Sequence, residues 1–207
     1  MIYTDRAAAG RALGGELEHL RASVPLVLGL PRGGVPVAAG VREIIGGDLD
    51  ILLVRKLGVP WQPELAMGAI GEDDARVLNR DVLAHLTLAP AEFAAVERAE
   101  RAELERRRAE WRGRREPLPL AGRTVILVDD GMATGATVVV ACRVARLRAP
   151  ARLVVAVPVS SAEAVQRVTA ECDELVCPLV PESLGGVGTA YQDFHQLADD
   201  EVSALLD

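Results

Sequence analysis

The sequence predicts an α/β fold in which a parallel sheet is flanked by helices on both faces. Short, continuously apolar segments alternate with segments of helical periodicity along most of the 207 residues, a pattern typical of parallel strands buried on both faces. The composition is 50% hydrophobic and 26% charged, and a chain of this length can bury a full core. We therefore expect residues 1–207 to form a single domain that carries an elaboration.

Five apolar segments and their helices account for the predicted sheet. A first helix begins after Thr4 or Asp5, either of which can cap it, with an apolar stripe at Ala9, Leu13, Leu17 and Leu20. Strands are expected at residues 25–30, 49–54, 125–128, 153–157 and 175–177. Further helices are expected over residues 36–45, from the loop after residue 128 to residue 147, and after Ser160 or Ser161.

Residues 57–120 interrupt this alternation. Apolar runs at 67–70 and 76–78 around the polar residues 71–74 predict a hairpin flap. A helix is expected over 90–116, with seven acidic and eight basic residues. One interpretation is a solvated helix with i, i+4 ion pairs. The other is a basic nucleic-acid face, whose field the interleaved glutamates would largely cancel. Its members would be Arg106, Arg107, Arg108, Arg112, Arg114 and Arg115.

Charge and cysteine content exclude several classes of protein. The net charge of −7 argues against a general nucleic-acid or anionic-membrane binder, which needs a large positive field. Three cysteines without a C-x-x-C pair cannot form a disulfide framework. No apolar run approaches 18 residues, and the N-terminus has no secretory h-region. We expect a cytoplasmic protein without a membrane partner.

The segment 125–137 carries the strongest functional signal. An apolar strand ends in Asp129 and Asp130, and small and hydroxyl residues then open a helix. The N–H groups of a helix start, with the Thr134 and Thr137 hydroxyls, suit a phosphate. The acidic pair suits sugar hydroxyls, or a Mg²⁺ held through waters. A ribose 5-phosphate would satisfy both halves, whereas no Walker-type or G-x-G-x-x-G motif occurs.

This segment resembles the motif that binds phosphoribosyl pyrophosphate (PRPP) in the type I phosphoribosyltransferases. That motif has four apolar residues, two acids and a loop ending in Thr-Gly-x-[Ser/Thr]. The resemblance implies that Asp129 and Asp130 bind the ribose 2′- and 3′-hydroxyls. It implies that the 5′-phosphate is held by Ala133, Thr134, Gly135, Ala136 and Thr137. The order of strands and helices from residue 25 to 177 is also similar to that family's core, and residues 178–207 would be its hood.

A second loop, residues 29–34, contains Arg32, Gly33 and Gly34. Backbone N–H groups and a guanidinium fork suit a pyrophosphate. Family members use this loop for pyrophosphate, often through a non-proline cis peptide, which we expect between Pro31 and Gly33. The strings L-P-R-G-G-V-P-V-A and R-K-L-G resemble those of bacterial members named only after the family.

Arg55 and Lys56 follow the strand predicted at 49–54. Lys56 is the only lysine among the 23 basic residues, and an ammonium is a compact charge that can pivot between phosphate oxygens. Orotate phosphoribosyltransferases have a similar Arg-Lys pair that contacts pyrophosphate, so the resemblance assigns that role to Lys56 and Arg55. The alternative is a solvated strand edge.

Three residues are candidates for contact with the base. Glu64 lies in the insertion, where the resemblance places a loop that closes over the active site; alternatively it is a solvated acid. Tyr191 and Phe194 lie in the hood and either stack on the base or pack the hood core. The 6-oxopurine enzymes have an aspartate at the position of Ala133, so the base itself stays open.

The resemblance implies Mg²⁺-dependent transfer of the 5-phosphoribosyl group from PRPP to a nitrogenous base, with release of pyrophosphate. Asp129 and Asp130 would support an oxocarbenium-like transition state, while Arg32 and Lys56 would stabilise the departing pyrophosphate. The alternative is a regulator of the same fold that senses PRPP or a nucleotide and binds RNA, against which the net charge of −7 counts. A third possibility is partnership with an amidotransferase. We also expect a homodimer or higher homo-oligomer.

Overall fold

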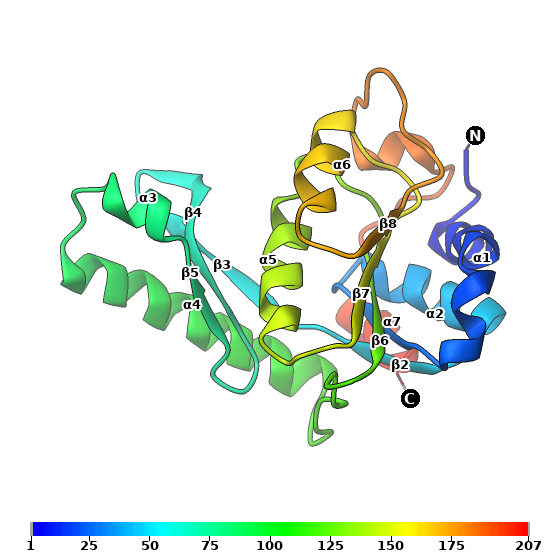
Figure 1. Cartoon of the computed structure of the whole chain (residues 1–207), viewed down its shortest axis with the longest axis horizontal. Coiled ribbons are helices and arrows are strands. Elements are labelled where there is room, and N and C mark those ends of the chain that lie inside the picture. Colours follow the sequence, from blue (N-terminus) through cyan, green and yellow to red (C-terminus); the bar gives the residue numbers. More distant parts are fainter. Residues whose placement is uncertain (1, 207) are drawn as a thin grey trace.

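A five-stranded parallel sheet forms the centre of the computed structural model, which describes residues 2–206 (Figure 1). The strand order is β2-β1-β6-β7-β8, and every neighbouring pair is parallel. The strands are β1 (Leu26–Gly29), β2 (Asp48–Ile51), β6 (Thr124–Val128), β7 (Arg152–Ala156) and β8 (Glu174–Val176). The predicted α/β class is confirmed. Because β1 and β6 are neighbours, the two loops expected to bind ligand leave the same edge.

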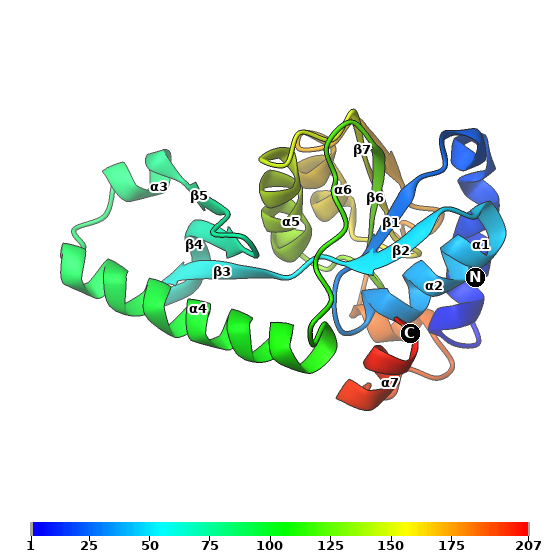
Figure 2. The same ribbon diagram turned by 90° about the horizontal axis from the view of Figure 1, so that it is seen from below.

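Helices cover both faces of this sheet (Figures 1 and 2). On one face lie α1 (Arg6–Glu16) and α2 (Gly34–Ile45), and on the other α5 (Ala136–Arg146) and α6 (Ala162–Thr169). Alternate strand residues serve the two layers, as the period of two in a strand requires. The first layer packs on Val27, Ile126, Val128, Val154 and Ala156. The second packs on Leu26, Leu28, Val125, Leu127, Leu153 and Val155.

Two helix starts show which of the predicted caps is used. The Asp5 carboxylate accepts from the Ala8 N–H at 2.7 Å, and the Ser161 hydroxyl accepts from the Ala164 N–H at 3.0 Å. Each side chain satisfies a donor that has no partner within the helix. The apolar stripe predicted for α1 is confirmed, since all four of its members are buried: Ala9, Leu13, Leu17 and Leu20. A short 3-10 helix, Glu18–Ser23, follows α1.

The insertion forms an arm that extends away from the sheet (Figure 2). It contains an antiparallel sheet of β3 (Val54–Val59), β4 (Gln62–Gly71) and β5 (Arg76–Leu78), then α3 (Arg80–Ala84) and α4 (Pro90–Trp111). The predicted hairpin is confirmed as β4–β5. The strand predicted at 49–54 is wrong in extent, because β2 ends at Ile51 and the chain then leaves the sheet for β3.

Helix α4 is shorter than the predicted 90–116. It ends at Trp111 because Gly113 adopts a left-handed conformation (φ +58°) that terminates the helix. Arg106 and Arg107 form ion pairs with Glu103 at 2.8 and 2.7 Å, which confirms the ion-paired interpretation. The alternative of a basic face is wrong for Arg112, because that side chain is buried.

Arg112 joins the arm to the core through a buried ion-pair network. Its guanidinium donates to Glu72 at 2.7 and 3.1 Å, to Asp50 at 2.7 and 3.0 Å, and to the Ile51 carbonyl at 2.9 Å. Glu72 comes from the β4–β5 turn and Asp50 from β2. Burial raises the pKa of Glu72, and the charge of Arg112 acts in the opposite direction. One side chain thus connects the hairpin, α4 and the sheet.

The chain after β8 folds back over the N-terminal segment. It forms a short 3-10 helix, Val187–Ala190, and α7 (Asp199–Ala204). Isolated bridges join Tyr3 to Tyr191 and Val159 to Leu179. Among the helices of residues 2–206, none combines the length and apolar character that a membrane crossing requires.

Candidate active site

The loop after β1 and the acidic pair after β6 touch one another at the carboxyl edge of the sheet. The Leu30 N–H donates to the Val128 carbonyl at 2.8 Å. A Cβ built on Gly33 would lie 1.9 Å from Asp130 Oδ2, and one on Gly34 would lie 2.4 Å from the Val128 carbonyl oxygen. Only glycine fits at position 34, where the obstacle is backbone, whereas a side chain at position 33 would have to displace the Asp130 carboxylate. The peptide bond Pro31–Arg32 is cis, as expected for this loop.

Replacing Gly34 by alanine should test this close contact. Because the atom in the way belongs to the backbone of β6, the loop must move, and we expect a loss of stability of about 1–3 kcal/mol together with weaker PRPP binding. Urea unfolding and calorimetry measure the two effects. Gly15→Ala is the control: an added Cβ meets no atom within 4 Å, and alanine should stabilise α1 by about 0.5–1 kcal/mol. A Gly34→Ala variant as stable as the wild type would contradict the packing.

The two acids have different surroundings. The Asp129 carboxylate accepts from the Asp130 N–H at 2.9 Å, and burial together with the charge of Asp130 raises its pKa well above the ordinary value. Asp130 is ion-paired with Arg6, whose Nε lies 2.9 Å from Oδ2. Burial raises the pKa of Asp130 as well, although Arg6 opposes this shift. Of these two acids, Asp129 is therefore the one whose negative charge is less compensated by neighbouring cations.

Arg6 is a site residue that the sequence interpretation missed. Its side chain is only 10% exposed; it binds Asp130, donates to the His195 carbonyl at 2.9 Å, and lies 3.9 Å above the Phe194 ring. One feature of the sequence could have indicated Arg6: a cation in the first turn of a helix opposes the helix dipole and so needs a compensating acid. Here the acid at the end of β6 compensates for that unfavourable position.

The hood aromatics pack against one another. Tyr191 is 7% exposed, lies 5.8 Å from the Tyr3 ring and 5.0 Å from the Phe194 ring, and donates its hydroxyl to the Asp130 carbonyl. Of the two interpretations, packing of the hood core holds for Tyr191, because its ring is not accessible to a base. Phe194 is 36% exposed, but the Arg6 guanidinium covers a face of its ring.

The conformation of the loop before α5 is fixed by a left-handed glycine and by hydrogen bonds from α6 and its N-cap. Gly135 is left-handed (φ +72°), and a Cβ there would meet Val168 at 3.0 Å. Arg167 donates to the Thr134 carbonyl at 2.7 Å, and the Ser161 hydroxyl donates to the Ala133 carbonyl at 2.7 Å. These bonds turn the carbonyls toward α6, and the N–H groups of the first turn of α5 have no helical partner. A cavity of about 240 Å³ lies along residues 131–138.

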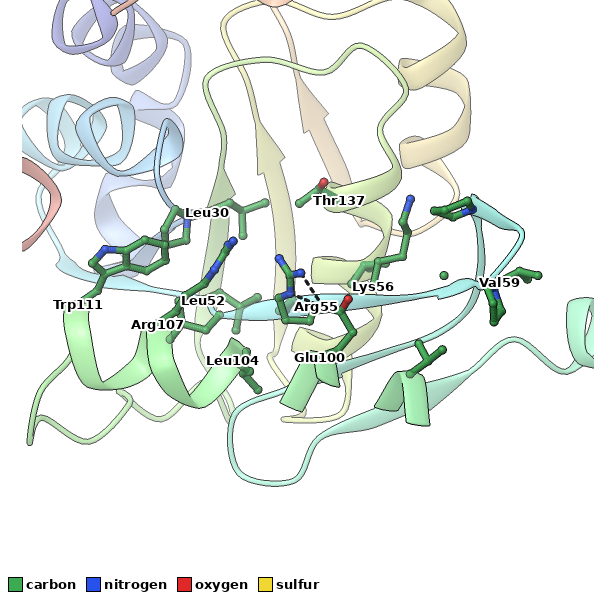
Figure 3. Close-up of a pocket in the computed structure, with 18 residues that line it drawn as sticks. Leu30, Leu52, Arg55, Lys56, Val59, Glu100, Leu104, Arg107, Trp111 and Thr137 are labelled. Atoms are coloured by element: carbon green, nitrogen blue, oxygen red, sulfur yellow. Dashed lines mark hydrogen bonds and ion pairs between the residues drawn. The ribbon is translucent and has the colours of Figure 1, made fainter. Parts of the chain in front are cut away.

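A larger cavity of about 510 Å³ separates the arm from the core (Figure 3). Pro31 of the first loop and Thr137 of the second contribute to its wall, so it adjoins both. Arg55, Lys56 and Glu100 reach it from the arm. The rest of its lining is largely apolar and includes Leu30, Leu52, Val54, Val59, Leu104, Trp111 and Val140.

Arg55 and Lys56 lie on β3 of the arm, which differs from the predicted position at the end of a sheet strand. Arg55 is ion-paired with Glu100 of α4 at 2.6 Å, whereas Lys56 is 3.2 Å from Glu64 of β4. The Glu64 side chain is 85% exposed, which agrees with the interpretation as a solvated acid rather than a base contact. Both cations line the large cavity together with Pro31 and Thr137. The structure therefore brings them near the two loops at the carboxyl edge of the sheet.

Arg32 is directed elsewhere. Its Nε lies 3.0 Å from Oδ1 of Asp199, and its Nη1 donates to the Leu197 carbonyl at 3.1 Å. Among residues 2–206, Arg32 contributes to the lining of neither cavity described above. The first turn of α7 thus supplies the guanidinium with a carboxylate, and its role toward pyrophosphate stays a prediction.

Curated and solved relatives resemble this chain along its length. Two Mycobacterium tuberculosis proteins, whose names place them among the phosphoribosyl transferases, are 49% identical over 206 residues. The match covers 100% of this chain and 46% of theirs, so the chain spans about half the length of the curated relatives it matches. A crystal structure of a Thermus thermophilus protein is 42% identical, covers 100% of this chain and 98% of that chain, and has a TM-score of 0.92.

A family model extends this similarity across the core, the arm and most of the hood. The model describes a phosphoribosyl transferase domain and matches residues 2–193. That range includes the acidic pair, the loop before α5, and the cis-peptide loop that touches Asp130. The chain therefore belongs to the phosphoribosyl transferase domain family.

Proposed function

We propose that the protein transfers the 5-phosphoribosyl group of PRPP to a nitrogenous base and releases pyrophosphate. The observation that carries the proposal is the contact between the Pro31–Gly34 loop and Asp130, beside the open N-terminus of α5. A diol site, a phosphate site and a glycine loop thus meet at one edge of the sheet. Few ligands other than a ribose carrying phosphates at two positions would use all three.

Each part of the site has a role in this proposal. The N–H groups and hydroxyls of Ala133–Thr137 bind the 5′-phosphate. Asp129 and Asp130 accept from the ribose hydroxyls, and their negative charge stabilises the cationic sugar as the bond to pyrophosphate breaks. The backbone of Gly33 and Gly34 approaches the pyrophosphate from one side, and Arg55 and Lys56 approach it from the cavity. The base stays open, because Tyr191 is buried and Glu64 is solvated.

The acidic pair is also compatible with Mg²⁺. Among residues 2–206, no group of three or more His, Cys, Asp or Glu side chains could hold a metal. Mg²⁺ is usually bound through one or two carboxylates together with substrate phosphates, and Asp129 and Asp130 supply two carboxylates. When bound with PRPP, the ion would neutralise charge on the pyrophosphate. A cytoplasmic location and a homo-oligomer stay predictions of the sequence.

Calorimetry with PRPP, with and without Mg²⁺, tests the proposal. We expect binding that is stronger with Mg²⁺, followed by pyrophosphate release when the right base from a panel is added. No binding at millimolar PRPP in either condition would overturn the proposed function.

Replacing Lys56 by arginine should reduce kcat at least about 10-fold, equivalent to about 1.4 kcal/mol of transition-state stabilisation. The charge is conserved, but a planar guanidinium cannot pivot between phosphate oxygens as an ammonium can. The affinity for PRPP should change little, because the contact strengthens only as pyrophosphate departs. Steady-state kinetics measure the effect, with slow PRPP hydrolysis as the readout until the base is known.

Arg76→Lys is the matched control for this substitution. Arg76 lies on β5 of the same arm, pairs with Glu97 at 3.0 Å and, among residues 2–206, is not part of the large cavity's lining. Its exchange conserves charge and should leave kcat unchanged. An unchanged kcat for Lys56→Arg as well would remove Lys56 from the reaction.

A further inference from the structure

The cavity between arm and core has a local excess of cations in a chain that is acidic overall. Among residues 2–206, its lining includes Arg55, Lys56 and Arg107 as cations and Glu100 as the one acid, a local balance of +2, whereas the whole chain carries −7. Arg55 is ion-paired with Glu100 at 2.6 Å, so Lys56 and Arg107 supply the excess. A concave, largely apolar site with an excess of one sign of charge concentrates the field on a ligand of the opposite sign. The cavity is therefore suited to an anion with more than one negative charge.

Arg107 is the cation of this group that the sequence analysis placed on the charged helix and did not assign to the ligand site. It projects from α4 toward the same space as Arg55 and Lys56, with Thr137 on the opposite side (Figure 3). The Trp111 ring, on the next turn of α4, lies 5.5 Å from its guanidinium carbon and supports the side chain. Its Nε donates to Glu103 at 2.7 Å, and within residues 2–206 neither Nη group has a hydrogen-bond partner. Arg107 thus presents unused donors to the cavity.

The guanidinium of Arg32, unlike that of Arg107, has its donors occupied by other groups of the protein. Its Nε and Nη2 face the Asp199 carboxylate at 3.0 and 3.4 Å, and its Nη1 donates to a carbonyl. Asp199 is itself held by the Trp111 Nε1–H at 2.7 Å. To bind a ligand, Arg32 would have to leave a carboxylate that α4 keeps in place.

We propose that Arg107, delivered by α4, is a pyrophosphate-binding residue of this protein and takes the place expected for Arg32. Two parallel N–H donors match two oxygens of a phosphate group, and the Nη groups of Arg107 provide such a pair. Arg32 is a positioning residue that ties the loop after β1 to α7. This inference rests on the proposed function, because it assigns one more contact to the same leaving group.

Calorimetry on the whole chain with Mg²⁺ tests the assignment, using inorganic pyrophosphate and inorganic phosphate as probes. Arg107→Met should weaken pyrophosphate binding at least about 10-fold, the loss expected for a charge-assisted contact. Phosphate binding at the α5 loop should not change. Arg107→Lys should restore part of the loss, since it returns the charge without the fork.

Arg106→Met is the matched control. Arg106 precedes Arg107 on α4 and shares Glu103 as its partner, but its side chain is 54% exposed and, among residues 2–206, it is not part of the cavity lining. It should bind both probes as the wild type does. Thermal unfolding of each variant verifies that the chain is folded before binding is compared.

The outcomes separate this inference from the proposed function. Wild-type protein that binds neither PRPP nor pyrophosphate would overturn the function, and with it the role of Arg107. Wild-type protein that binds both, with Arg107→Met equally tight, would overturn only the role of Arg107. A larger loss in Arg32→Met than in Arg107→Met would return the contact to Arg32 and also overturn the inference.

Discussion

Replacing Asp129 by asparagine should reduce turnover on the order of 10²–10³-fold, the range found when one stabilising group is removed from a developing charge. In the proposed reaction the sugar becomes cationic as pyrophosphate leaves, so a carboxylate beside it stabilises the transition state more than the bound substrate. Asparagine keeps the shape of the side chain and loses the charge. PRPP binding should weaken much less than turnover.

The same substitution should leave the chain folded and make it more stable near neutral pH. The pKa of Asp129 is raised in the folded state by burial and by Asp130, so the folded protein holds that proton more tightly than the unfolded chain. Stability from this group is present below the unfolded pKa of about 3.9 and is lost as the pH rises through the folded pKa. Asparagine does not ionise, and its advantage should therefore grow from acid to neutral pH.

Steady-state kinetics and urea unfolding between pH 4 and pH 8 measure these effects. Asp48→Asn is the control, because Asp48 is an exposed acid at the start of β2 that pairs with Arg123. Replacing Asp130 is a poorer test, since it would leave the nearly buried Arg6 without its carboxylate. Near-wild-type turnover in Asp129→Asn would show that this acid does not support the reaction.

Replacing Arg112 by methionine should lower the free energy of unfolding by about 3–5 kcal/mol, the loss found when one member of a buried ion pair is removed. Glu72 and Asp50 would keep their buried carboxylates without the cation that both contact. At roughly 2–4 °C per kcal/mol for a chain of this size, Tm should fall by roughly 6–20 °C.

The effect of Arg112→Met should depend on pH in a defined direction. Burial already raises the pKa of Glu72, and Arg112 opposes the rise; without Arg112 the pKa rises further. Because a raised folded pKa means stability lost as pH increases, the deficit should be larger at pH 7 than at pH 4. Adding Glu72→Gln to the variant should recover part of the loss. Arg106→Met, on the surface of the same helix, should not change Tm. A variant with wild-type Tm at pH 7 would show that the network does not hold the arm.

Local patterns were sufficient for the framework and for part of the site. The three central strands β1, β6 and β7 formed at the predicted apolar segments because these are apolar enough to be buried on both faces. The outer strands β2 and β8 overlap their predicted segments but are only partly buried. Asp129, Asp130 and the loop through Thr137 lie within nine consecutive residues, so their order alone indicated neighbouring sites for a diol and a phosphate. The glycines of the first loop were predicted for the same reason: a tight turn is a local requirement.

Only the tertiary structure decided which charges far apart in the sequence meet. Arg32 is paired with an acid 167 residues further along the chain, and Arg6 with one 124 residues away. Arg107 is an ordinary member of an ion-paired helix by sequence, yet the packing of α4 against β3 places it beside Lys56 in a cavity. The sequence by itself determined the central strands of the parallel sheet, the acidic pair and the phosphate loop, because these depend on residues a few positions apart. The partner of a long charged side chain depends on how whole helices and strands pack. No local sequence pattern encodes which elements come together.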